Sequence, residues 1–223
     1  MAKKVMAKKA TYHHGDLRQA LLKAALELLK IKDAKSISLR EVARTAGVSH
    51  TAPYRHFEDK AALLAAIAKE GFIEFGDYLK AAVEAANARP VESLQATGIA
   101  YVRYALDHPT HFRVMFGSFP ADEPADSELY CVSKGTFQIL VDIIKSGQAA
   151  GLMRAGDPEF LALGKWSMVH GLAMLLLDGM LPTSEETSLE LVQALVSESM
   201  KSLVTSEIEL SNEQDVFSKI LDG

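Results

Sequence analysis

The stretch Ile37-Ser-Leu-Arg-Glu-Val-Ala-Arg-Thr-Ala-Gly-Val-Ser-His-Thr-Ala-Pro-Tyr-Arg-His-Phe57 decides the fold of the N-terminal part of this chain. Ser38 and Glu41 have the spacing of a capping box, which predicts a helix that begins directly after Ser38. Gly47 follows the last apolar position of that helix, where a residue free to adopt positive φ ends a helix. Ser49 is the predicted N-cap of a second helix. The stretch therefore predicts two short helices joined by a glycine turn.

The second predicted helix carries side chains that form hydrogen bonds. A helix-turn-helix places the first residues of its second helix against base edges in the major groove, which suits His50 and Thr51. Tyr54 and His56 lie further along and have polar tips that can reach phosphate oxygens. Asp59 is the predicted cap of the next helix, so Lys60 and free backbone N–H groups would form a phosphate clamp. An ordinary helical hairpin is the alternative interpretation.

The charge distribution favours the nucleic-acid interpretation. Residues 1–60 contain 13 Lys and Arg against 6 Asp and Glu, whereas residues 61–223 contain 11 against 23. The whole-chain pI of about 5.8 hides this asymmetry. A basic patch beside a duplex releases condensed counterions, so a basic end on an acidic protein indicates nucleic-acid binding at that end.

Two stretches resemble a known family. Residues 47–64, Gly-Val-Ser-His-Thr-Ala-Pro-Tyr-Arg-His-Phe-Glu-Asp-Lys-Ala-Ala-Leu-Leu, resemble the DNA-binding signature of TetR-type transcriptional regulators, and residues 12–22 resemble the run into their first helix. Residues 166–175 are similar to the Trp-x-x-x-His-Gly stretch of one subgroup's C-terminal domain. The resemblance implies that Arg40 contacts DNA as well. The candidate DNA-binding residues are Arg40, Ser49, His50, Thr51, Tyr54, Arg55, His56 and Lys60.

The length and patterning predict an all-α protein in three parts. These are a basic arm over 1–15, a three-helix DNA-binding domain over 16–60, and a ligand-binding and dimerisation domain over 61–223. Asp16 is the predicted cap of the first helix, and a long helix is expected from Asp59 to about Ala86, acting either as a lever or as a rigid strut. Further helices are expected at 91–107, 109–116, 124–150, 157–180 and 184–204.

Composition also bears on location and assembly. A single cysteine, Cys131, excludes an internal disulfide, and we find no signal peptide or membrane span, which together favour the cytoplasm. The 157–180 helix is apolar almost all round and needs partners on two sides. With the 184–204 helix it is predicted to form half of a four-helix bundle between two subunits, as the resemblance also implies. A homodimer would engage both halves of a near-palindromic operator.

Aromatic and methionine residues gather in the predicted second domain, where the resemblance implies a pocket for a small-molecule effector. His170 could bond to that ligand or to a buried carbonyl. His108 and His111 have i, i+3 spacing, but Pro109 lies between them and the sequence shows no third ligand, so no metal or cofactor is expected. The candidate ligand-binding residues are Tyr101, Tyr104, Met115, Phe116, Phe119, Phe137, Trp166 and His170.

Two other function classes compete with a regulator. An enzyme is disfavoured because we find no glycine-rich phosphate loop, no nucleophile elbow and no His-Glu-x-x-His motif. A helical dimer that binds small molecules and has lost DNA binding conflicts with the retained Tyr54, His56 and Lys60. The sequence thus predicts a one-component transcriptional repressor released by a ligand, with activation as the alternative mode of regulation.

Overall fold

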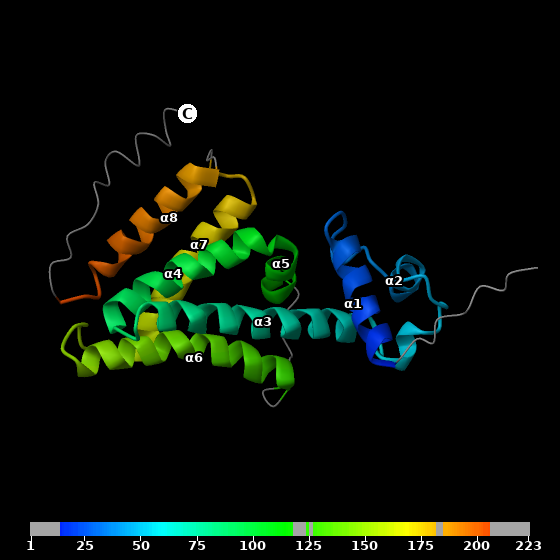
Figure 1. The fold of residues 1–223 in the computed structure, drawn as a ribbon, viewed down its shortest axis with the longest axis horizontal. Coiled ribbons are helices and arrows are strands. Elements are labelled where there is room, and N and C mark those ends of the chain that lie inside the picture. Colours follow the sequence, from blue (N-terminus) through cyan, green and yellow to red (C-terminus); the bar gives the residue numbers. More distant parts are fainter. Residues whose placement is uncertain (1–13, 118–123, 125–126, 182–184, 206–223) are drawn as a thin grey trace, which may run out of the picture. The chain divides into compact units, whose positions relative to one another are not determined.

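The computed structural model describes residues 14–117, 124, 127–181 and 185–205, which form helices and no strand. The all-α prediction is therefore confirmed. The described chain divides into two compact units, Met1–Ile67 and Ala68–Gly223. The elements, coloured along the chain in Figure 1, are α1 (His14–Leu29), α2 (Leu39–Thr45), the 3-10 helix η1 (Pro53–Arg55), α3 (Lys60–Ala85), α4 (Pro90–Asp107), α5 (Pro109–Gly117), α6 (Glu128–Ala149), α7 (Pro158–Leu177) and α8 (Glu185–Met200).

In the first unit α1 packs against α2, and α2 packs against η1. The Ser38 side chain accepts a hydrogen bond from the Glu41 N–H, as the capping-box spacing predicts. Gly47 has φ of +69°, and the Val48 N–H reaches the Ala43 carbonyl at 2.9 Å. This is the Schellman arrangement, in which a glycine in the left-handed region ends the helix. Both ends of α2 therefore lie where the sequence predicts them.

The second helix of the pair is shorter than predicted. A turn at His50 and Thr51 leads into the single 3-10 turn η1. Ser49 does not cap it through its side chain, because the Ser49 hydroxyl lies 3.2 Å from the Thr51 hydroxyl. An α-helix that began at Ser49 would need an N–H group at position 53, and Pro53 has none. The chain forms a short 3-10 turn there instead.

Other boundaries of the first unit agree with expectation or shift slightly. The helix α1 begins at His14, two residues before the expected cap Asp16. The Asp59 carboxylate accepts a hydrogen bond from the Ala62 N–H at 2.8 Å, so Asp59 caps α3 as predicted. Residues 1–13 of the predicted basic arm lie outside the described residues.

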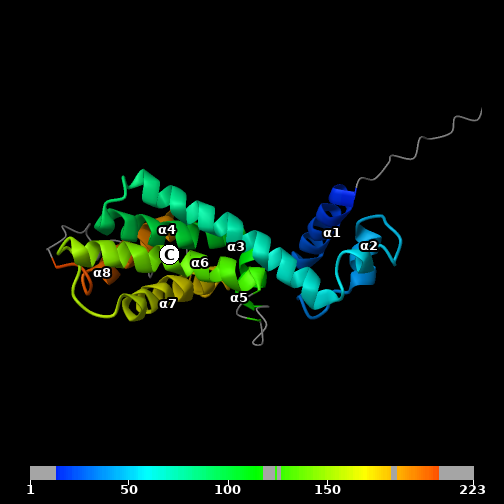
Figure 2. The same cartoon turned by 90° about the horizontal axis from the view of Figure 1, so that it is seen from below.

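In the second unit α4 is central, packing against α5, α6, α7 and α8 (Figures 1 and 2). Buried aliphatic side chains on α4, α6, α7 and α8 form its main core, among them Leu94, Val141 and Ile144. The later part of α3 lies against α5 at Gly71, where an added Cβ would be 2.7 Å from the Met115 sulfur. Glycine at this position therefore permits a close approach of the two helices.

The helix boundaries of this unit follow the signals in the sequence. The Asp157 carboxylate accepts hydrogen bonds from the N–H groups of Glu159 and Phe160, at 2.8 and 3.3 Å, and Pro158 occupies the first helical position. This is the predicted start of α7. Gly151 and Gly179 have positive φ directly after α6 and α7, so glycine ends these two helices as well.

The helix α7 is apolar around much of its circumference. It is long and apolar enough to cross a membrane. A single helix of this kind is weak evidence for a membrane protein, because core helices share these properties. It packs against α4, α6 and α8. Its exposed side chains include Phe160, Leu163 and Leu175. The sequence predicted that this apolar helix needs partners on two sides, and its contacts within the chain leave these apolar side chains exposed.

Candidate DNA-binding surface and ligand cavity

The turn before η1 and η1 itself present polar side chains on a buried support. Pro53 is buried, and Phe57 is 4% exposed beneath the guanidinium of Arg18, which lies 5.7 Å from the ring centroid. These contacts fix the segment in place while the side chains around them remain accessible. The exposed candidates are Arg40, Ser49, His50, Thr51, Tyr54 and Arg55, and the Tyr54 side chain is 53% exposed.

Two candidates for DNA binding are less accessible than the others. The Lys60 ammonium donates a hydrogen bond to the Lys35 carbonyl at 2.8 Å, so it holds the segment between α1 and α2. His56 is half-buried, and its Nε2 is buried without a hydrogen-bond partner among the described residues. The Lys60 ammonium keeps further N–H donors for a phosphate, whereas His56 would have to rotate outward to contact one.

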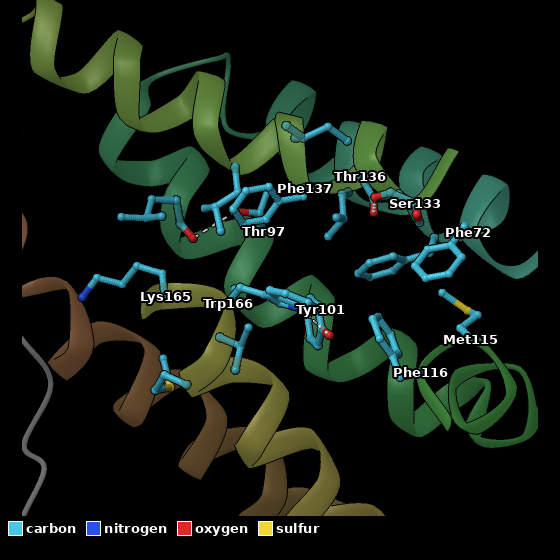
Figure 3. A pocket seen from close by; sticks show the side chains of 18 of the residues that line it. Phe72, Thr97, Tyr101, Met115, Phe116, Ser133, Thr136, Phe137, Lys165 and Trp166 are labelled. Carbon is cyan, nitrogen blue, oxygen red and sulfur yellow. Dashed lines mark hydrogen bonds between the residues drawn. The ribbon is translucent and has the colours of Figure 1, made fainter. Parts of the chain in front are cut away.

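A cavity of about 440 Å³ lies among the helices of the second unit. Figure 3 shows Tyr101 and Trp166 near its middle, with Phe72, Met115 and Phe116 toward one end and Lys165 toward the other. Its walls are mainly apolar, and its volume falls within the range of ligand-binding pockets. The lining residues are Phe72, Phe75, Leu79, Leu94, Thr97, Gly98, Tyr101, Met115, Phe116, Tyr130, Ser133, Lys134, Thr136, Phe137, Ile139, Leu140, Lys165, Trp166, Met168, Val169, Val196, Ser199 and Met200.

A hydrogen-bonded triad stands at one wall of this cavity. The Tyr101 hydroxyl accepts a hydrogen bond from Trp166 Nε1 at 2.9 Å and lies 2.9 Å from His170 Nδ1. Burial raises the pKa of Tyr101, so its hydroxyl keeps its proton, and burial lowers the pKa of His170, which favours neutral imidazole. We therefore assign the hydroxyl proton to a bond with Nδ1. Trp166 and His170, one turn apart on α7, thus hold Tyr101 of α4 between them.

Several of the other polar groups along the cavity bond to the protein itself. The hydroxyls of Ser133 and Thr136 donate to the carbonyls of Tyr130 and Ser133 at 2.9 and 2.7 Å, and Thr97 donates to Ser93 at 2.7 Å. The Lys165 ammonium bonds to the carbonyl of Ser199, near the C-terminal end of α8. The cavity therefore offers a ligand a large apolar surface, with Tyr130 and Lys134 as further polar residues of its lining.

The structure brings five of the eight candidate ligand-binding residues to the cavity. Tyr101, Met115, Phe116, Phe137 and Trp166 line it. The remaining three are placed differently. Tyr104 is fully buried away from the cavity and donates to the Gly71 carbonyl at 3.1 Å, and His170 stands behind Tyr101 rather than on the wall. Phe119 lies outside the described residues.

Much of the cavity wall consists of residues that were not predicted from the sequence. The missed residues include Phe72, Phe75 and Leu79 of α3, which repeat at helical spacing and look like ordinary core positions. Gly98 was also missed, although a glycine inside an otherwise regular helix signals close packing. An added Cβ at Gly98 would lie 2.9 Å from Val196. These residues could be recognised as lining only once the helix packing was known.

Comparisons with known proteins identify the family. Residues 21–67 match the model of bacterial regulatory proteins of the tetR family, and residues 94–198 match that of the tetracyclin repressor-like C-terminal domain. The chain belongs to the TetR family. It is thus a TetR-type DNA-binding transcriptional regulator, as the resemblance implied. A search of curated protein sequences found no match.

Solved structures share the fold of this TetR-family protein. A protein with unknown function from Rhodococcus sp. RHA1 is 35% identical over 87% of this chain and 96% of its own, with a TM-score of 0.73. A bacterial regulatory protein in the tetR family from Rhodococcus RHA1 is 21% identical, over 86% and 98%, with a TM-score of 0.69. AibR, solved in complex with isovaleryl coenzyme A and operator DNA, is 18% identical, over 82% and 97%, with a TM-score of 0.64.

Proposed function

We propose that this TetR-family regulator represses transcription in the cytoplasm by binding a near-palindromic operator as a homodimer, and that a small molecule in the cavity releases it. The combination of a TetR DNA-binding unit and an apolar cavity in one chain carries this proposal. We assign operator binding to residues 16–60 and ligand binding with dimerisation to residues 61–223. Neither proposed role, operator binding or ligand binding, involves catalysis.

The candidate DNA-binding residues fall into two groups, those that suit base edges and those that suit phosphates. His50 and Thr51 in the turn before η1 are exposed and suit base edges, with the neighbouring Ser49 hydroxyl bonded to that of Thr51. Tyr54 and Arg55 suit phosphate oxygens, which carry no sequence information. Arg40 is exposed in the first turn of α2 and Lys60 in the first turn of α3 is half-buried, and we propose both as further phosphate contacts.

A matched pair of arginines on α2 tests the DNA-binding surface. Arg40→Ala should weaken binding to the duplex upstream of the protein's own gene and flatten the salt dependence by about one unit of slope per subunit, since one phosphate contact is lost. Arg44, one turn later, is 80% exposed and already lies 3.6 Å from the Glu41 carboxylate, so Arg44→Ala is the control. Fluorescence anisotropy over a salt series measures both. Equal effects of the two substitutions would contradict the assignment.

One face of α7 suits a second copy of the chain. Exposed Phe160, Leu163 and Leu175 accompany Gly164 and Gly171, and an added Cβ at either glycine would meet no atom within 4 Å. Small residues on a helix face allow another helix to approach closely, and the apolar side chains beside them gain from being covered. We propose that this face, together with α8, forms the four-helix bundle of the homodimer.

Two glycine substitutions test the dimer. Gly171→Arg should be tolerated within the subunit because the space around it is open, but it should prevent close approach of a second α7. Gly135 on α6 is also helical with open space around it, so Gly135→Arg is the matched control. Sedimentation velocity should show a monomer for the first variant and a dimer for the second. A dimer in both cases would exclude this face of α7.

The cavity predicts the chemistry of the effector. Because the lining is mainly apolar, and the hydroxyls of Ser133 and Thr136 and the Lys165 ammonium bond to the protein, we propose a mainly apolar small molecule that packs on Phe137 and Trp166. AibR, which has a similar fold, was solved in complex with isovaleryl coenzyme A and operator DNA. Organic extraction of the purified protein followed by mass spectrometry should recover such a molecule in one equivalent.

A cavity-filling pair of variants tests whether this molecule acts from the cavity. Ser133→Trp would occupy the cavity, whereas Ser146→Trp places the same side chain on an exposed position of α6. The recovered molecule should release operator DNA from the Ser146 variant and fail to release it from the Ser133 variant, both of which should bind operator without it. Release of operator DNA from both variants would show that the effector does not act from this cavity.

A further inference from the structure

A second cluster of functional side chains lies in the second unit, outside the cavity wall. Glu74 of α3, His108 at the end of α4 and His111 of α5 each place one potential ligand atom within 4.8 Å of the other two. The His108 Nε2 atom lies 3.9 Å from the Glu74 Oε1 atom. Glu70, one turn earlier on α3, is close enough for its negative charge to favour protonated His111, although burial lowers the pKa of His111 overall. The residues come from three helices that are separate in sequence.

The start of α5 explains why Pro109 does not separate the two histidines. Pro109 is the first residue of α5, and the Phe112 N–H donates to the His108 carbonyl at 3.0 Å, so His108 occupies the N-cap position. His111 is then the third residue of the helix. The N-cap and third positions face each other, as they do in a capping box. Because α5 begins at Pro109, the two imidazoles lie on the same side of the chain.

The third ligand comes from close packing of α3. Tyr104 donates to the Gly71 carbonyl at 3.1 Å and lies 3.4 Å from the Glu74 carboxylate, while its ring stacks on His108 with centroids 4.6 Å apart. An added Cβ at Gly71 would lie 3.7 Å from the Cβ of His111. Tyr104 thus orients His108 by stacking, its hydroxyl lies near the Glu74 carboxylate, and the absent side chain at Gly71 lets α3 approach α5.

We propose that Glu74, His108 and His111 bind a divalent transition-metal ion of the Zn²⁺ class, with Glu70 or water completing the coordination. Two imidazoles and a carboxylate are a ligand set that suits Zn²⁺. With metal–ligand bonds of about 2.0–2.1 Å, the ligand atoms of a tetrahedral site lie about 3.3 Å apart. Glu74 is exposed, so its carboxylate can move the short distance required. The bound ion would tie α3 to the junction of α4 and α5.

The experiment titrates Zn²⁺ into the metal-free full chain against a chromophoric chelator. A parent carrying His13→Gln and His14→Gln removes the adjacent histidines of the N-terminal segment as competing ligands. We expect one equivalent of Zn²⁺ to bind and to raise the melting temperature. Glu74→Gln, His108→Asn and His111→Gln should each weaken binding at least about tenfold, since even the loss of a residue that only orients a ligand has that effect.

The controls separate loss of a ligand from loss of structure. Asn is a favoured N-cap residue, so His108→Asn should keep the start of α5 intact, and circular dichroism checks the helix content. Glu84→Gln makes the same charge change at an exposed position of α3 away from the cluster. It should leave Zn²⁺ binding unchanged. Co²⁺ should give a visible absorption band with the parent and the Glu84 variant but not with the His108 variant.

Two outcomes would overturn the proposal. One is the absence of saturable Zn²⁺ binding by the full chain. The other is binding that the three substitutions leave unchanged. Operator binding of the same proteins is measured in the presence of EDTA, so a failure of the metal site is distinguishable from a failure of DNA binding.

Discussion

The hydroxyl of Tyr101 is the best-defined polar contact in the cavity wall, and its removal gives a measurable loss of stability. Tyr101→Phe keeps the ring, which is 5% exposed, but leaves Trp166 Nε1 and His170 Nδ1 without their shared partner. Each hydrogen bond contributes about 1 kcal/mol net, and a donor left unsatisfied in the interior costs about 1–3 kcal/mol. Because Trp166 and His170 are only half-buried, water can replace part of the loss.

We therefore expect a loss of about 2 kcal/mol in the free energy of unfolding, which lowers the melting temperature by roughly 4–8 °C for a chain of this size. Urea denaturation at pH 7.5 measures the free energy, and the m-value should not change. Tyr78→Phe is the control, because its half-buried hydroxyl makes no hydrogen bond within the part of the chain that the structure describes. That variant should unfold within about 0.5 kcal/mol of the parent protein.

A double-mutant cycle extends this test to the shared hydrogen bonds. If Trp166→Phe and Tyr101→Phe remove the same bond, the double variant should lose less stability than the two single variants together. Additive losses, or equal losses for Tyr101→Phe and Tyr78→Phe, would refute the assignment of the triad as a stabilising network.

Three further outcomes follow from other local contacts. Asp157→Ala removes the side chain that caps α7 and should cost about 0.5–2 kcal/mol in urea denaturation. Gly98→Ala places a methyl group 2.9 Å from Val196 and should destabilise by about 1 kcal/mol net, whereas Gly135→Ala, with open space around it, should stabilise by roughly 0.5–1 kcal/mol. Burial lowers the pKa of His170, so the unfolded chain binds its proton more readily, and stability falls as the pH drops below the unfolded pKa of about 6.5. Melting temperatures at pH 7.5 and 5.5 should therefore differ less for His170→Asn than for the parent protein, and an unchanged difference would exclude His170 as a contributor.

Helix boundaries were predictable because local residues determine them. Asp157 followed by Pro158 fixes the start of α7, and Gly47 fixes the end of α2 through its positive φ. Such signals lie within a few residues of the structure they specify, so a single sequence reveals them.

Contacts between distant segments were not predictable in the same way. Tyr101 and Tyr104 lie one turn apart on α4 and look equivalent in sequence, but only Tyr101 faces the cavity while Tyr104 points to α3. Glu74 is more than thirty positions from His108, so no spacing rule links them. The 3-10 form of η1 was also missed, since Pro53 is compatible both with an opening helical turn and with a tighter one.

The close contact of Gly71 with Met115 joins the effector cavity to the backbone of α3. Met115 lines the cavity and is fully buried, so a molecule that displaces its thioether pushes on a helix with no intervening side chain to absorb the movement. The same helix runs unbroken back to Lys60. Effectors of graded length should consequently differ in potency according to how far they extend toward this sulfur atom.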